Sequence, residues 1–365
     1  MTSAEWHVEA ITGRPVRRIA VVRALQLGDL LLAVPALRAI RRGYPDAEIT
    51  LIGLPWASSF VTRFSDYLDR FREFPGFPGI HEVDHDPCRT ARFLNTEVAY
   101  GYDLVIQAHG SGVTSNPFAL ALGGGVTAAF YEGEPPPGVT IGACYPGTLP
   151  EIWRNLELAR LLGCPADDPS LEFPLTADDR HEARRLLAGV PHDRPLVGIH
   201  PGATIAARRW QPERFAVVAD DLATAFGARI VITGGPGEEA VAARVARQMS
   251  GEALVVAGET SLGGLGAIIN QCDLFISNDT GPAHIAVALD VPSVIVFGPS
   301  ELHRWAPLDG NRHQVVVRDV ACRPCGHAVC PIDHRCLDWI APEAVIETAS
   351  RLLGRRQVEV MACAD

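Results

Sequence analysis

Short β-rich runs alternate with amphipathic helical runs along this chain, and the alternation occurs twice. In the first half, a strand-like run at Arg18–Arg23 precedes a helical stretch at Asp29–Arg42, followed by EITLIG and DLVIQAH. In the second half, the strand-like runs are LVGIHPG, ARIVITGG, ALVVAG, DLFIS and SVIVFGP. Such alternation is typical of parallel α/β layers. We therefore expect an α/β protein with two doubly wound, Rossmann-like domains that face a central cleft.

A stretch rich in Pro, Gly and Asp separates the two halves at 164–179. A chain of 365 residues is long enough for two domains of ordinary size. We place the N-terminal domain at 1–174 and the C-terminal domain at 175–341. A final helical stretch in 342–365 is expected to pack back on the N-terminal domain.

The formal net charge of −11 argues against general nucleic-acid binding. No apolar run is long enough to span a bilayer, and the first residues lack the apolar core of a signal peptide, which predicts a cytoplasmic protein. Seven arginines and one acid lie between Arg14 and Arg42. This basic stretch is read as a solvated face, or as a peripheral contact with an anionic acceptor or the inner face of a membrane.

The sequence contains no lysine, so all 32 residues counted as Lys or Arg are arginine. This excludes a Schiff-base lysine, a pyridoxal-phosphate anchor and a Walker A lysine. Any phosphate must be held by arginine, backbone amides or hydroxyls. No G-x-G-x-x-G follows the first strand, so a dinucleotide cofactor has little support.

Asp29 follows Gly28 at the start of the first long helical stretch. One interpretation is a helix N-cap, whose carboxylate accepts hydrogen bonds from amides of the first turn. The other is a general base, held ionised by the surrounding arginines, that takes a proton from an acceptor hydroxyl.

The stretch ISNDTGPAHIA contains an Asp-Thr-Gly triplet that resembles the aspartic-protease signature. That class needs two such Asp side chains in an all-β fold, and here there is one triplet between a strand and a helix. The alternative is an anion site, with Thr280 and Gly281 at the helix cap and Pro282 at the first helical position. His284 in the first turn can donate to a phosphate oxygen, or it is a packed core residue.

Two further segments end strands of the second half. The turn Gly202-Ala203-Thr204 can present backbone amides to an anion, and Arg208 and Arg209 follow it, either as diphosphate ligands or as surface charge. Glu238, or its neighbour Glu239, can accept hydrogen bonds from a ribose, or else supplies charge to a first helical turn.

Four cysteines with the spacing C-x2-C-x4-C-x5-C lie near the end of the chain, at Cys322, Cys325, Cys330 and Cys336. This density suggests a structural zinc site, with a metal cluster or a redox disulfide as alternatives. A C-x2-C pair without a second C-x2-C pair is, however, an incomplete zinc motif.

Together these segments resemble glycosyltransferase family 9, the ADP-heptose:lipopolysaccharide heptosyltransferases. The resemblance rests on LGDLLLAVPALRAIRRGYPDAEITLI, HPGA with RRW, TGGPGE and SNDTGPAHIAVALDVPSVIVFGPS, in the family's order. It implies an inverting GT-B enzyme that needs no catalytic cofactor and binds a nucleotide-activated heptose with its C-terminal domain.

The resemblance also implies roles for individual residues. Asp29 would be the base, Glu238 would contact ribose, and Arg208 would stand where the family usually has a lysine. Asp279, Thr280 and Gly281 would contact the donor diphosphate, with His284 nearby. The acceptor would be a glycan or lipid-linked glycan such as lipopolysaccharide core. Transfer to another glycan or a natural product, a nucleotide-sugar epimerase or hydrolase of the same fold, and a non-catalytic sugar-nucleotide binding protein remain alternatives.

Overall fold

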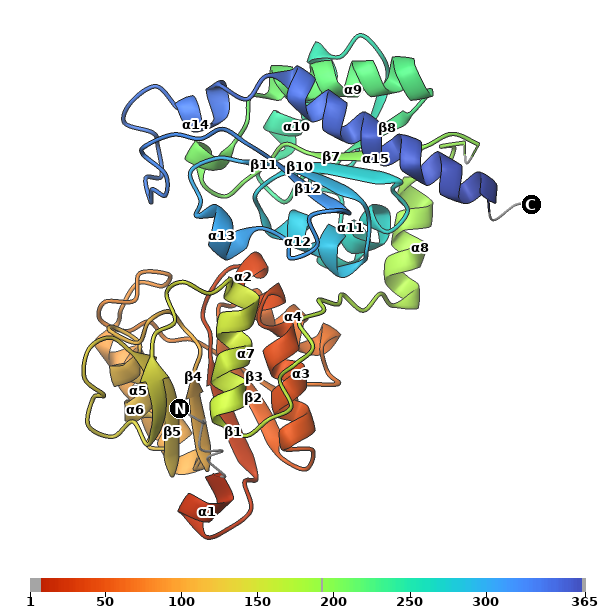
Figure 1. Ribbon diagram of the computed structural model, residues 1–365. Coiled ribbons are helices and arrows are strands. Elements are labelled where there is room, and N and C mark those ends of the chain that lie inside the picture. The colour runs from red at the N-terminus through yellow and green to blue at the C-terminus, as the bar shows by residue number, and fades with distance from the viewer. Residues whose placement is uncertain (1–7, 192, 363–365) are drawn as a thin grey trace. The chain divides into compact units, whose positions relative to one another are not determined.

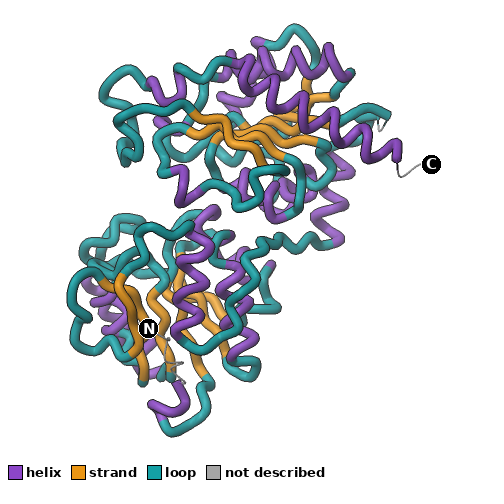
Figure 2. Tube along the Cα trace, in the orientation of Figure 1, coloured by secondary structure: helices purple, strands orange, loops and turns teal. Residues whose placement is uncertain are grey.

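The computed structural model describes residues 8–191 and 193–362, with side chains given as far as residue 355. It divides into two compact units, Met1–Ser170 and Leu171–Asp365, close to the predicted boundary at 174. Each unit has a six-stranded parallel sheet with helices on both faces (Figures 1 and 2). The expectation of two Rossmann-like domains of the GT-B type is confirmed.

The sheet of the N-terminal unit has the strand order β3-β2-β1-β4-β5-β6, and all neighbouring strands are parallel. Its strands are β1 (Arg18–Val22), β2 (Glu48–Gly53), β3 (Arg70–Glu73), β4 (Leu104–Gln107), β5 (Val126–Tyr131) and β6 (Ile141–Cys144). Its helices are α1 (Val8–Thr12), α2 (Leu27–Leu31), α3 (Val34–Gly43), α4 (Ala57–Arg63), α5 (Pro87–Tyr100), α6 (Asn116–Ala121) and α7 (Glu151–Leu161). Helices α3 and α7 pack together, while Phe93 of α5 and Phe118 of α6 belong to the core on the sheet.

The helix expected at Asp29–Arg42 is divided into α2 and α3. Pro35 lies in the first turn of α3, where it has no N–H to donate. A continuous helix would bring its ring against the carbonyl of Leu31, four residues earlier, so the chain turns at this point. The division leaves Asp29 on a short helix of its own, directly after β1.

The sheet of the C-terminal unit has the order β12-β11-β10-β7-β8-β9, again all parallel. Its strands are β7 (Leu196–His200), β8 (Arg229–Ile232), β9 (Ala253–Val255), β10 (Leu274–Asn278), β11 (Ser293–Phe297) and β12 (His313–Val317). Its helical elements are α8 (Ala177–Leu186), η1 (Ala206–Arg208), α9 (Pro212–Phe226), α10 (Glu239–Gln248), α11 (Leu262–Ile269), α12 (Gly281–Ala288), α13 (Leu302–Trp305), α14 (Arg335–Asp338) and α15 (Pro342–Ala362).

The long final helix α15 packs on the C-terminal unit. Its residues Val345, Ala349 and Leu352 are part of the same buried core as the strands and α9. In Figure 1 it lies with α9 and α10 on one face of this sheet, while α11 and α12 lie on the other. We expected this helix to pack on the N-terminal domain; its apolar residues instead complete the C-terminal core. The expected span 342–365 extends at its end beyond the described residues.

The arginines between Arg14 and Arg42 do not form one solvated face, which corrects the sequence interpretation. Arg23 and Arg38 are buried, with exposed fractions of 2% and 8%. Arg14 pairs with Asp103, and Arg41 pairs with Asp69. Among the described helices, none combines the length and apolar character that crossing a bilayer requires.

In each unit the first strand lies beside the fourth, β1 beside β4 and β7 beside β10. The strand order reverses at these positions, so the segments that follow the two strands diverge and leave room for a ligand at the carboxyl edge. Asp29 follows β1, and the predicted donor-site segments follow β7 and β10. Asp29 and these two segments thus lie at the switch points of the two sheets, whereas Glu238 follows the neighbouring strand β8.

Candidate functional site

The anion site predicted from the Asp-Thr-Gly triplet lies at the N-terminus of α12. Thr280 is the N-cap in an extended conformation, and its side chain makes no capping hydrogen bond. We predicted Pro282 to be the first helical residue. The helix begins at Gly281, so Pro282 is the second. Pro282 has no N–H, and the Ala283 amide donates to the Thr280 carbonyl at 3.1 Å. The amides of Thr280 and Gly281 are therefore the ones that α12 can offer to an anion, and the helix dipole favours negative charge there.

Asp279 lies immediately before this cap and is 5% exposed. Its Oδ2 atom is buried and has no hydrogen-bond partner among the described residues. A buried carboxylate oxygen without a donor is costly, so such an atom indicates a ligand group that donates to it.

His284 is buried in the first turn of α12, close to Asp279 and Arg208. Burial lowers the pKa of this imidazole below its ordinary value; the charge of Asp279 raises the pKa, and the charge of Arg208 lowers it further. The neutral ring carries one N–H, which suits it to donate to an oxygen of a bound anion.

The lowered pKa of His284 predicts a pH dependence of stability. Below the ordinary pKa near 6.5, the unfolded chain takes up a proton that the folded chain does not, so the free energy of unfolding falls as the pH decreases. We expect His284→Gln to lose less stability than the wild type when the pH is lowered from about 8 to about 5.5. Urea denaturation of both proteins at each pH measures this; an equal loss in the two proteins would contradict it.

Glu238 lies at the N-cap of α10, after β8. Its Oε2 accepts a hydrogen bond of 2.7 Å from the Gly235 amide and lies 3.4 Å from His200 Nε2. Burial alone would raise its pKa, but the contact with His200, the Gly235 amide and the charge of Arg209 outweigh burial and hold the pKa below its usual value. An ionised carboxylate at the sheet edge is suited to accept hydrogen bonds from sugar hydroxyls.

Gly202 lies against this carboxylate. A Cβ atom at Gly202 would come within 2.3 Å of the Glu238 carboxyl group, so a larger residue there would displace that carboxyl group from its present position. The Glu238 carboxylate thus packs directly on the turn after β7.

The remaining predicted residues of this turn differ in their surroundings. Thr204 is exposed, and Arg208 ends the 3-10 turn η1. The Nε atom of Arg209 donates to the carbonyl of Ala203 at 2.7 Å. Arg209 therefore fixes the turn, while Arg208 is the arginine close to the buried His284.

Asn278, the last residue of β10, was not singled out from the sequence. Its Oδ1 accepts from the Trp210 amide at 2.9 Å, and its Nδ2 donates to Pro201 O at 2.9 Å and Gly202 O at 3.3 Å. It joins the segment after β7 to the helix cap after β10. An amide side chain directly before the Asp-Thr-Gly triplet, at the end of a buried strand, was the available signal.

The carboxyl edge of the N-terminal sheet carries Asp29. The N-cap of α2 is Gln26, so Asp29 lies within the first turn and the N-cap interpretation was wrong. The carbonyl of Asp29 accepts a hydrogen bond of 3.0 Å from Arg23 Nε. The side chain is half-buried.

A buried ionic network supports the Asp29 turn, and sequence reasoning missed it. Arg23 donates to Asn155 Oδ1 at 3.0 Å and to Glu151 Oε1 at 2.9 Å, both on α7. Arg154 NH1 donates to the other oxygen of Glu151 at 3.1 Å. Asn155 Nδ2 donates to Leu32 O at 3.3 Å, just after α2. Arg23 and Leu32 are each more than a hundred residues from their partners on α7, which no local pattern reveals.

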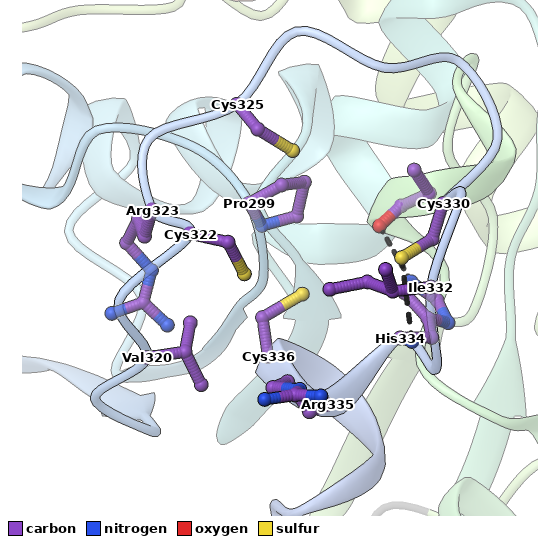
Figure 3. Close-up of a pocket in the computed structure, with 11 residues that line it drawn as sticks. Pro299, Val320, Cys322, Arg323, Cys325, Cys330, Ile332, His334, Arg335 and Cys336 are labelled. Carbon is purple, nitrogen blue, oxygen red and sulfur yellow. Dashed lines mark hydrogen bonds between the residues drawn. The ribbon is translucent and has the colours of Figure 1, made fainter.

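The four clustered cysteines line one pocket of the C-terminal unit, and all are free thiols (Figure 3). The disulfide alternative is not realised in this structure. As the side chains lie, the described residues include no group of three His, Cys, Asp or Glu with metal-binding geometry.

Comparison with known proteins adds to this geometry. A family model described as "Glycosyltransferase family 9 (heptosyltransferase)" matches residues 94–335. Lipooligosaccharide heptosyltransferase 2 of Campylobacter jejuni serotype O:2 is 31% identical over 163 residues, 43% of this chain and 51% of that protein. Lipopolysaccharide heptosyltransferase 3 of Escherichia coli K12 is 25% identical over 341 residues, 89% of this chain and 95% of that protein. The chain thus matches about half the length of the first relative and nearly all of the second.

The fold has similar solved structures. The E. coli heptosyltransferase WaaC with ADP-2-deoxy-2-fluoro heptose superimposes with a TM-score of 0.62 at 22% identity, covering 92% of this chain and 99% of that chain. At 22% sequence identity this similarity supports a shared fold and carries no further conclusion.

Proposed function

This chain belongs to glycosyltransferase family 9, and from that premise we propose that it is an inverting glycosyltransferase with an ADP-activated heptose as donor. The acceptor is a hydroxyl of a glycan such as lipopolysaccharide core. The named relatives are heptosyltransferases of lipopolysaccharide or lipooligosaccharide, and the WaaC structure contains an ADP-heptose analogue. These names support the donor and acceptor classes.

The observation that carries the proposal is the grouping at the switch point of the C-terminal sheet. The α12 N-terminus, the neutral His284 and the cationic Arg208 form a site for a diphosphate. The unpartnered Asp279 Oδ2 requires a donor, and a carboxylate repels phosphate oxygens. We therefore assign Asp279 to a hydroxyl of the donor next to the diphosphate, and the Glu238 carboxylate to the ribose.

The proposed reaction is a single displacement. Asp29 takes the proton of the acceptor hydroxyl while that oxygen attacks the anomeric carbon from the face opposite the diphosphate. The bond between the anomeric carbon and the phosphate oxygen breaks, and its electron pair leaves with ADP. Arg208 and the amides at Thr280 and Gly281 stabilise the charge that develops on the leaving diphosphate. In this proposal no divalent metal takes part in catalysis.

The test is incubation of the purified protein with ADP-heptose and a heptose-acceptor glycolipid, with mass spectrometry of the products. We expect a mass increase of one heptosyl group on the acceptor and an inverted anomeric configuration by NMR. UDP and GDP sugars serve as donor controls. Turnover of donor without acceptor would indicate a hydrolase or epimerase, and donor binding without turnover would indicate a binding protein; either result would overturn the proposal. Peripheral membrane contact through exposed arginines and a cytoplasmic location stay predictions.

Removing the guanidinium group of Arg208, which we propose binds the diphosphate, should weaken donor binding. We expect Arg208→Ala to raise the Kd for ADP about 10- to 100-fold, because a charge-assisted hydrogen bond contributes about 1.5–3 kcal/mol. Isothermal titration calorimetry measures it. Arg247→Ala is the matched control, since Arg247 is exposed on α10 and should leave the Kd unchanged. Equal affinities for the two variants would exclude Arg208 from the site.

A further inference from the structure

The segment between β12 and α14 has no regular secondary structure and contains three of the four clustered cysteines. We call residues 318–336, which include the fourth, the cysteine loop. Val320 and Cys336, near the two ends of this loop, belong to the buried core, whereas Val329 and Ile332 between them are 73% and 59% exposed. A long segment without its own helix or strand needs another source of order.

The four thiols face one space. Figure 3 shows the side chains of Cys322, Cys325, Cys330 and Cys336 directed into the same pocket from different parts of the loop. The pocket encloses a void of about 20 Å³, room for roughly one water-sized sphere. Its lining includes Arg323 and Arg335 but no carboxylate, and Arg335 pairs with Asp333 at 2.7 Å.

Four thiol groups around one space are the donor set of a thiophilic metal ion. Four thiolates in tetrahedral arrangement bind zinc or iron, and the C-x2-C spacing is the one that such sites use. The positive charge of Arg323 favours the net negative charge of a metal bound by four thiolates. The side chains as placed do not yet form a metal-binding group, so binding requires the sulfur atoms to move inward around the void.

We propose that Cys322, Cys325, Cys330 and Cys336 together bind one thiophilic ion of the zinc or ferrous class, which orders the cysteine loop. The ion displaces the four thiol protons to solvent and forms four metal–sulfur bonds, with no change in oxidation state.

The ordered loop in turn supports the donor site. The Ala207 amide donates to Ala328 O at 3.1 Å, and the Nε2 of His334 donates to Ala207 O at 2.8 Å. Both groups of Ala207 are thus held by the cysteine loop, and the next residue is Arg208. The ion therefore fixes the backbone that carries the diphosphate arginine. This second step rests on the proposed function; the metal site itself does not.

The experiment uses the full chain, purified without chelator, and measures zinc and iron by plasma mass spectrometry. We expect about one ion of zinc or iron per chain in the wild type, and loss of that ion in Cys322→Ser and in Cys325→Ser. Cys144→Ser, which alters an exposed cysteine of β6, is the matched control and should keep the ion. Replacement by Co²⁺ should give thiolate charge-transfer and tetrahedral ligand-field absorption in the wild type and in the control only.

Wild-type protein with no zinc or iron and no cobalt spectrum would overturn the site, as would metal retained by both loop variants. A mass loss of two hydrogens on oxidation, with a disulfide mapped within the loop and no metal, would also overturn it in favour of a redox pair. Titration with ADP, together with the metal measurement, tests metal binding and the support of Arg208 separately. Metal loss with an unchanged Kd refutes the support of Arg208 alone, whereas a wild type that holds metal but binds no ADP refutes the proposed function alone.

Discussion

Asp29→Asn is expected to lower kcat by about 10²–10⁴-fold, because the amide cannot accept the proton of the acceptor hydroxyl. The substitution keeps the size of the side chain and leaves the carbonyl that bonds to Arg23 in place. We therefore expect the Kd for ADP and the thermal midpoint to stay close to wild-type values. Single-turnover transfer assays at saturating donor and acceptor measure the effect on chemistry.

Gln26→Ala is the control for this prediction. Gln26 is the N-cap of α2, its side chain makes no capping hydrogen bond, and it is exposed. This variant alters the same turn without removing a carboxylate, and its kcat should change little. A wild-type rate in Asp29→Asn would eliminate Asp29 as the base.

Glu151→Ala should destabilise the N-terminal unit by about 3–5 kcal/mol, the cost of leaving buried charges without their partner. Glu151 lies between Arg23 and Arg154, whose side chains are 2% and 4% exposed. Both guanidinium groups are therefore largely shielded from the bulk solvent that would otherwise replace the carboxylate. Urea denaturation followed by tryptophan fluorescence and circular dichroism measures the free energy of unfolding.

A matched control lies on the same helix. Glu157 pairs with Arg160 at 3.1 Å, and both side chains are about two-fifths exposed. Glu157→Ala should cost less than about 1 kcal/mol, because solvent screens an exposed pair. Similar losses for the two variants would show that burial of the network contributes nothing. Glu151→Ala is also expected to lower kcat, since Arg23 and Asn155 hold the turn that carries Asp29.

The sequence predicted the central elements of the C-terminal unit well. The strand-like runs LVGIHPG and ARIVITGG coincide with β7 and β8. The strands DLFIS and SVIVF are buried along their length and therefore appear as continuous apolar runs. The strands β3, β5, β6 and β12 were not predicted. Of these, β3, β6 and β12 are short, partly exposed edge strands, whereas β5 is a buried interior strand.

The candidate site was predictable where a local motif carried it. Helix-cap chemistry located Thr280 and Gly281 from the sequence. The contacts of Glu238 with His200 and of Asn278 with Gly202 depend on which strands are neighbours, and strand order cannot be read from a single strand. The basic stretch was misjudged for a related reason. Arg23 is an interior residue because Glu151 is its partner, and those two residues meet only in the folded sheet.

The hydrogen bonds of Asn278 have a thermodynamic consequence for ligand recognition. They attach the turn after β7 to the end of β10 within the core, so the two segments of the proposed diphosphate site are already held together before a ligand binds. The conformational entropy of these segments is lost during folding and not when the nucleotide arrives. The same polar contacts consequently give a larger association constant than they would on mobile loops.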